Sequence, residues 1–161
     1  MSDISQVSLE ETLEELKKYE VRSDLWTFLW KFPADSRLKV GILEGILGHV
    51  LEKAGFSKDK IYDAILVSEE ALTNAIKHGS KGNREKHVAF GVNLFPPKTA
   101  CIAEFFCEDE GEGFRSEDVS DPLKNLEADH GRGILLMRAY ADGLAYNRKG
   151  NRVEWYILNN F

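Results

Sequence analysis

The sequence has little of what marks several large classes of protein. Among its 161 residues there are two cysteines, Cys101 and Cys107, and their spacing fits neither a disulfide framework nor a CxxC zinc site. No stretch approaches the ~18 uninterrupted apolar residues of a membrane-spanning helix, and the acidic N-terminus lacks the apolar core of a secretory signal. There is also no internal repeat and no low-complexity tract. We therefore expect a protein of the reducing cytoplasm, outside the membrane.

Positive charge is in short supply as well. Lysine and arginine number 21 against 27 aspartate and glutamate residues, which gives a formal net charge of −6 at pH 7. Nucleic acids and anionic membranes both select a basic surface, so this balance argues against either as the main partner. Hydrophobic residues make up 43% of the chain and aromatic residues 11%, which is enough for the core of one globular domain of this length.

The spacing of the apolar residues predicts both helices and strands. A capping box formed by Ser8 and Glu11 begins a short amphipathic helix. Helices are expected over 8–20, about 38–54, 57–78 and 131–141. Strands are expected, from period-two alternation, over about 25–32, 88–94, 99–107, 143–148 and 152–158. Because the strands outnumber the helices between them and come in hairpins, we expect an α+β two-layer sandwich, with a mixed, mostly antiparallel sheet and helices on one face.

The helix expected over 57–78 carries polar residues that packing does not explain. Glu70, Asn74 and His78 recur every four residues and so share one helix face. Asparagine is a poor helix former, its side-chain oxygen suits Mg²⁺, and a glutamate one turn away can orient or deprotonate a nucleophile. For this helix alone, the alternative is a solvated face with an incidental asparagine.

A second cluster follows the strand expected over 99–107. Asp109 is followed by two closely spaced glycines and an aromatic residue in the segment DEGEGF, 109–114. Glycines let the backbone approach a flat ligand, and a carboxylate that faces an exocyclic amine would select adenine. The alternative is an ordinary acidic turn.

A third cluster follows a long connection over 108–131, a length that is more typical of a functional loop than of a simple link. Gly131, Arg132 and Gly133 then open a helix. The free N–H groups and positive dipole of a helix N-terminus suit a phosphate, and the arginine adds donors for its oxygens. The alternative is a flexible loop end before an ordinary helix.

Taken in order, these segments resemble the N, G1 and G2 boxes of the GHKL (Bergerat-fold) ATPases. They read SEEALTNAIKHG at 68–79, DEGEGF at 109–114 and GRGILLMRAYAD at 131–142. Their residue patterns are most similar to those of the bacterial anti-sigma-factor serine/threonine kinases. The resemblance covers about 24–158 and implies a histidine-kinase-like ATP-binding domain over 24–161, preceded by an extension over 1–23. It also implies ATP or ADP and Mg²⁺ as ligands, and a homodimer.

The resemblance further implies a role for individual residues. Asn74 would coordinate Mg²⁺, Glu70 would act as general base toward the acceptor hydroxyl, and Asp109 would accept from the adenine amino group. Arg132 would take part in catalysis by neutralising phosphate charge. The other residues expected to bind the nucleotide are His78, Gly111, Gly113, Phe114, Gly131, Gly133 and Ile134, and residues 115–130 match the mobile ATP lid.

The implied function is partner switching in the regulation of transcription. Such a kinase would bind a sigma factor in one state and phosphorylate an anti-anti-sigma antagonist in another, without direct contact to nucleic acid. A nucleotide-gated binding module of the same fold, without kinase activity, is the alternative, because the motifs do not separate binding from transfer. A detached histidine-kinase catalytic domain is disfavoured, since 1–23 is too short for a phosphoacceptor helix pair. A domain with a purely structural role is disfavoured as well, because the three motifs would then occur in this order by coincidence.

Overall fold

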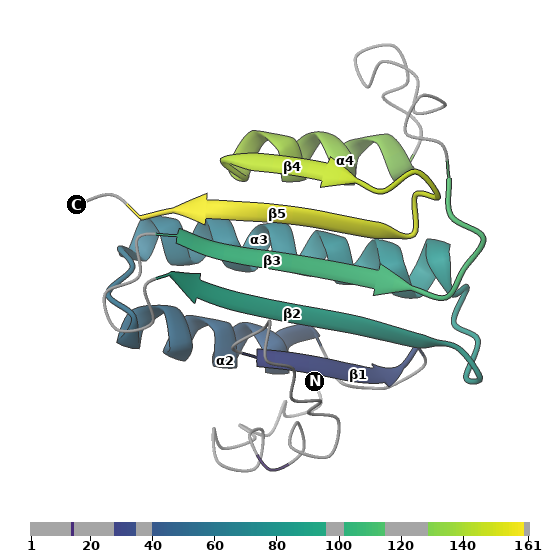
Figure 1. Ribbon diagram of the computed structural model, residues 1–161, viewed down its shortest axis with the longest axis horizontal. Coiled ribbons are helices and arrows are strands. Elements are labelled where there is room, and N and C mark those ends of the chain that lie inside the picture. The colour runs from purple at the N-terminus through teal and green to yellow at the C-terminus, as the bar shows by residue number, and fades with distance from the viewer. Residues whose placement is uncertain (1–13, 15–27, 35–39, 96–101, 115–128, 160–161) are drawn as a thin grey trace, which may run out of the picture.

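The structure, a computed structural model, describes residues 14, 28–34, 40–95, 102–114 and 129–159. Within these residues a single five-stranded sheet is covered on one face by helices, as Figure 1 shows. The elements follow in the order β1 (Phe28–Pro33), α2 (Val40–Lys53), α3 (Lys58–Asn74), the π-helical turn η1 (Ala75–Gly79), β2 (His87–Phe95), β3 (Ile102–Asp109), α4 (Asp129–Tyr140), β4 (Gly143–Tyr146) and β5 (Arg152–Leu158). The predicted two-layer α+β architecture is confirmed.

The sheet has the strand order β1-β2-β3-β5-β4, and each of these pairings is antiparallel. The prediction of a mixed sheet is therefore corrected for the described strands. The chain leaves β3 through α4 and returns as β4 in the same direction as β3, which would make a parallel pair if the two were neighbours. The hairpin after β4 instead places β5 between them, so that each strand pairs only with antiparallel neighbours.

Local sequence signals account for the helix boundaries. Ser57 has extended backbone angles and its side chain accepts a hydrogen bond from Lys60 N, which makes it the N-cap of α3. α2 ends at Lys53, shortly before Gly55, whose φ of 85° favours glycine. α4 begins at Asp129, two residues before the glycine that was expected to open it. None of the helices in the described part of the chain is long and apolar enough to cross a membrane.

The core lies between the sheet and the helices. Alternate residues of β1, β2, β3 and β5 point to the helices, and aromatic rings fill the centre. The ring centre of Phe105 lies 5.3 Å from that of Trp155, on which it stacks, and the ring centre of Phe90 lies 6.4 and 6.0 Å from those of Phe105 and Trp155. Burial of each such side chain stabilises the fold by roughly 1.5–3 kcal/mol. α3 packs between α2 and α4 over this core, and the Cys107 thiol of β3 donates to Ala71 O of α3. The core thus holds the C-terminal end of α3 beside the end of β3.

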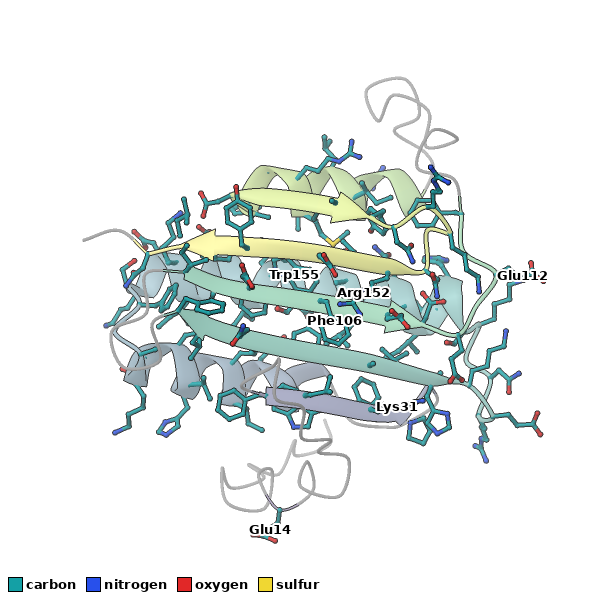
Figure 2. The ribbon with its side chains drawn as sticks, viewed as in Figure 1. Glu14, Lys31, Phe106, Glu112, Arg152 and Trp155 are labelled. Carbon is teal, nitrogen blue, oxygen red and sulfur yellow. The ribbon has the colours of Figure 1, made fainter. Side chains whose placement is uncertain are left out.

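The face of the sheet away from the helices is different in character. There the Arg152 guanidinium lies 3.9 Å from the centre of the Phe106 ring (Figure 2), an arrangement favoured by the negative face of an aromatic ring. A Cβ on Gly91 would overlap that ring, so the glycine makes room for Phe106 to lie flat on the sheet.

Most of the N-terminal prediction falls outside the described residues. Of the expected helix over 8–20, only Glu14 is described. The division into an extension over 1–23 and a domain over 24–161 stays a prediction.

Candidate functional site

The N-terminal part of α4 runs against the face of α3 that carries Glu70 and Asn74. A Cβ atom on Gly133 would lie 2.7 Å from Glu70 Oε2 and 3.4 Å from Asn74 Nδ2. The first distance is shorter than real Cβ contacts allow, so a side chain at position 133 would force the Glu70 carboxylate to move. The structure therefore brings the first and third sequence motifs together, with a carboxylate and an amide beside the beginning of a helix.

The last turn of the long helix is π-helical, over Ala75–Gly79. Ser80 N donates to Ala75 O at 2.8 Å and Gly82 N donates to Ile76 O at 3.0 Å. Such turns occur often at functional sites. His78 lies within this turn and is exposed.

The second motif packs against this turn. A Cβ on Gly79 would overlap the carboxylate of Asp109, and a Cβ on Gly111 would overlap the carbonyl of Gly79. Gly79 therefore leaves room for the Asp109 carboxylate, and Gly111 lets the backbone after β3 lie against the end of η1. The third motif contacts residues near the end of α3, and the second contacts η1 directly after it.

Asp109 is a buried carboxyl group. It is only 8% exposed, and its Oδ1 accepts a hydrogen bond from Gly111 N at 2.7 Å. Burial raises the pKa of Asp109 above its ordinary value of 3.8, although the Gly111 N–H and the positive charges of Lys149 and Lys86 act in the opposite direction. Raised pKa values of buried carboxyl groups are concentrated at functional sites.

The glycine-rich segment after Asp109 is bounded by the hairpin between β4 and β5. Gly113 has a φ of 77° and a Cβ there would overlap Lys149 O. The ring of Phe114, which is 37% exposed, packs edge-on against Tyr146 at 5.0 Å. The predicted lid segment follows directly, and its residues 115–128 lie outside the described part of the chain.

The remaining predicted residues lie on α4. Arg132 is exposed, and Gly131 lies in the first turn of the helix, where N–H groups have no intrahelical acceptor. The side chain of Ile134 is buried in the hydrophobic core, so any contact that it makes with a ligand would come from its backbone. The alternation of apolar residues along this helix could have indicated that orientation.

The residues that the sequence analysis missed lie in the β4–β5 hairpin. Asn151 Nδ2 donates to Asp109 O at 2.8 Å, from 42 positions further along the chain. Lys149 places a positive charge near the same carboxylate. In the sequence, the only signal was a three-residue turn with a glycine, which predicts a hairpin and not a partner for Asp109.

The oxygen atoms of Glu70 and Asn74 suit a hard metal ion that takes its other ligands from water and phosphate. In the described ranges no group of three or more His, Cys, Asp or Glu residues gathers as a metal site. Glu70 and Asn74 nevertheless offer oxygen donors side by side. This fits Mg²⁺, which usually takes one or two protein ligands and fills the other positions with water and phosphate oxygens.

Replacing Gly79 with alanine is expected to lower the free energy of unfolding by about 1–3 kcal/mol, because the new methyl group would overlap the buried Asp109 carboxylate. Gly45, within α2, is a matched control, since a Cβ there meets nothing within 4 Å. Gly45→Ala is expected to raise the free energy of unfolding by roughly 0.5–1 kcal/mol. Urea denaturation measures both changes, and equal stability of the two variants would contradict the proposed packing of Gly79.

Comparisons with known proteins give three kinds of match. The family described as histidine kinase-like ATPase domain matches residues 32–157. The serine-protein kinase RsbW of Bacillus licheniformis is 31% identical over 114 residues, 64% of this chain and 67% of the relative. RsbW of Bacillus subtilis is 28% identical over 120 residues, which cover 70% of this chain and 72% of the relative. The histidine kinase domain from the Erythrobacter litoralis EL346 blue-light activated histidine kinase has a TM-score of 0.47 and 15% identity, with coverage of 94% of this chain and 75% of its own.

Proposed function

Because the chain belongs to the histidine kinase-like ATPase domain family, we propose that it is an ATP-dependent protein serine/threonine kinase of the anti-sigma-factor type. It binds a sigma factor in one state and phosphorylates an anti-anti-sigma antagonist in another. The observation that carries this proposal is the meeting of three motifs along α3 and η1: Gly133 of α4 lies against Glu70 and Asn74, and Asp109 lies against Gly79. The naming of the relatives as serine-protein kinases supports it.

Asp109 forms the base-binding end of the proposed site. Its ionised carboxylate accepts a hydrogen bond from the adenine amino group, a contact that a guanine carbonyl cannot make. The Gly111 N–H already occupies Oδ1 at 2.7 Å, so the carboxylate is oriented before the nucleotide binds. Gly111 and Gly113 have no side chains that would project into the site, and Phe114 and His78 lie at its edge.

The other end of the proposed site holds the phosphates. The N–H groups at the beginning of α4, from Gly131 to Ile134, and the guanidinium of Arg132 offer donors and positive charge. Asn74 contributes an oxygen for Mg²⁺, and ATP supplies the phosphoryl group. Glu70 receives the proton of the acceptor serine or threonine hydroxyl. Positioning and electrostatic stabilisation account for most of the catalysis in such a site.

The proposal extends to assembly and location. A homodimer in the cytoplasm, in contact with its two protein partners and with no nucleic acid, follows from the resemblance to the anti-sigma-factor kinases. Sedimentation of the purified protein measures the state of association, and a mass equal to one chain of 18.2 kDa at micromolar concentration would contradict the dimer.

The function is tested by phosphotransfer. The purified protein is incubated with Mg²⁺ and γ-labelled ATP together with each candidate anti-anti-sigma protein of the same organism. We expect label on a serine or threonine of one of them, and no label when EDTA removes the metal. Nucleotide binding without labelled protein would contradict the kinase and identify a nucleotide-gated binding module, and the absence of nucleotide binding would contradict both.

Replacing Gly133 with alanine is expected to slow phosphotransfer by roughly 10- to 100-fold. Its Cβ would lie 2.7 Å from Glu70 Oε2, which is the free end of a side chain, so the protein still folds while the carboxylate moves away from the acceptor. Gly48→Ala is the control, because a Cβ there has an ordinary contact of 3.8 Å with Ile65. Turnover at saturating Mg-ATP is compared with the melting temperature; a normal turnover in Gly133→Ala would contradict the assigned position of Glu70.

A further inference from the structure

We propose that the β4–β5 hairpin, residues 147–151, positions the base-binding carboxylate of Asp109, with Asn147 and Asn151 as the positioning residues. The inference rests on the proposed function, since it takes Asp109 to be the acceptor for adenine. It goes beyond that function because it places part of the determinant of nucleotide affinity in a turn that belongs to none of the three motifs.

Asn147 closes the hairpin through its side chain. Its Oδ1 accepts hydrogen bonds from the backbone N–H groups of Gly150 at 2.8 Å, Asn151 at 3.1 Å and Arg152 at 3.2 Å. Its Nδ2 donates to Asn151 Oδ1 at 2.8 Å. One amide therefore fixes both the backbone of the turn and the orientation of the Asn151 side chain.

Asn151 transmits this order to Asp109. Asn151 Nδ2 donates to Asp109 O at 2.8 Å, and Asn151 O accepts from Asp109 N at 2.9 Å. Both backbone polar groups of Asp109 are thus held by a single residue. With its backbone fixed and its Oδ1 bonded to Gly111 N, the carboxylate has little freedom to turn.

The same hairpin also supports the glycine-rich segment beyond Asp109. Gly113 and Gly150 both have a φ near 78°. A Cβ on Gly113 would overlap Lys149 O, and a Cβ on Gly150 would overlap Phe114 O. The two segments therefore fit together as bare backbones, and a shift of the hairpin must move the segment from 109 to 114 with it.

The charges around Asp109 make this position sensitive to the hairpin. Lys149 in the hairpin and Lys86 before β2 favour the ionised carboxylate, whereas Glu108 on β3 disfavours it. Among the described residues, Cys107 and Tyr146 are further titratable neighbours, and burial raises their pKa values so that both stay neutral. A new negative charge at position 151 would oppose the ionisation of Asp109, against the effect of Lys149 and Lys86.

The test compares two substitutions that each exchange an amide for a carboxylate. Asn151→Asp removes the donor to Asp109 O and adds a charge beside it. Asn147→Asp keeps the three bonds that Oδ1 accepts, and it replaces the donor to Asn151 Oδ1 with a charged oxygen that repels it. Asn83→Asp is the matched control. Asn83 lies in an exposed turn, and its Oδ1 accepts a hydrogen bond from Glu85 N that a carboxylate can also accept. ADP binding is measured by calorimetry between pH 5 and pH 8, and the melting temperature is measured without nucleotide.

We expect ADP to bind roughly tenfold more weakly to Asn151→Asp, in line with the loss of a partly buried hydrogen bond. Asn147→Asp should weaken ADP binding by a smaller factor. In Asn151→Asp the pH below which affinity falls should move upward, a change that a merely structural role would not produce. Asn83→Asp should bind as the wild type does. If Asn151→Asp does not fold, Asn147→Asp decides the question by the same comparison.

Two results would overturn the inference, and they are distinguishable. If the wild type binds ADP and both hairpin variants bind it equally well at every pH, the positioning role is wrong while the proposed function stands, even if the variants melt at a lower temperature. If the wild type itself binds no ADP, the proposed function is wrong, and the inference falls with it.

Discussion

Replacement of Glu70 with glutamine is expected to slow phosphotransfer by about 10²- to 10⁴-fold and to leave ADP binding within a few-fold of the wild type. Glutamine has the shape of glutamate and can still hydrogen-bond, but its amide cannot take up the proton of an acceptor hydroxyl. Glu70 lies on α3 beside Gly133 of α4, whereas Asp109, the proposed contact to adenine, lies against Gly79, nine residues further along the chain. Loss of the general base therefore slows phosphotransfer without weakening ADP binding.

The neighbouring glutamate provides the control for this experiment. Glu69 shares a hydrogen bond with Glu44 of α2, and burial together with the charge of Glu69 raises the pKa of Glu44. Glu69→Gln makes the same chemical change one residue away, on a side chain that faces α2, and should leave phosphotransfer unchanged. Single-turnover labelling of the antagonist and calorimetry with ADP are measured on both variants. Undiminished transfer by Glu70→Gln, or an equal loss in both variants, would contradict the role of Glu70.

Replacement of Asp109 with asparagine is expected to weaken ADP binding roughly 10- to 100-fold without destabilising the protein. The amide offers an N–H group where the adenine amino group requires an acceptor. In the folded protein, however, the ionised carboxylate is disfavoured by burial, and this raises its pKa above 3.8. A neutral isostere avoids that penalty, so at pH 7 the free energy of unfolding of the variant without nucleotide should equal or exceed that of the wild type.

The pH dependence of the wild type follows from the same raised pKa, with opposite signs for stability and binding. Between the ordinary pKa of 3.8 and the raised value, the folded state binds the proton more tightly than the unfolded chain does. The stability from this group is therefore fully present below 3.8 and is lost as the pH rises through the raised pKa. ADP affinity changes the other way: it falls as the pH drops through that pKa, because protonation removes the acceptor.

Both dependences should be absent in Asp109→Asn, and urea denaturation and calorimetry across pH measure them. Glu110→Gln serves as the control. Glu110 is the adjacent residue but is exposed, and the His87 N–H, with the charges of Lys31 and His87, lowers its pKa. We expect this variant to bind ADP as the wild type does. Wild-type affinity for ADP in Asp109→Asn would show that the base is recognised elsewhere.

Much of the fold was predictable because the signals are local. The alternation around Phe90 and Phe105 predicts strands with one buried face, and both residues lie in the core. Ser57 predicts the beginning of α3, and its side chain does cap that helix. The expected strand over 143–148 ends at Tyr146 in the structure, because Asn147 turns its amide back onto the following N–H groups. Such a side-chain bond competes with the continuation of a strand.

The candidate site was predictable in its residues but not in its geometry. Spacing alone placed Glu70 and Asn74 on one helix face, since that relation depends only on the helical repeat. It could not show that Gly133 would lie against them, because that contact joins two helices separated by two strands. The π-helical turn over Ala75–Gly79, which contains His78, also escaped prediction.

The sequence by itself determined the elements and the chemistry of this protein: periodic apolar residues, a capping serine and three ordered motifs whose meaning depends on short-range spacing. The tertiary structure alone decided which of these meet. The place of β5 between β3 and β4 makes the sheet wholly antiparallel, and it brings Asn151 to Asp109 across 42 residues. The reason is physical. A contact between distant segments depends on how the whole core packs and on the space that each backbone leaves for its neighbours, and a local sequence pattern predicts neither of these.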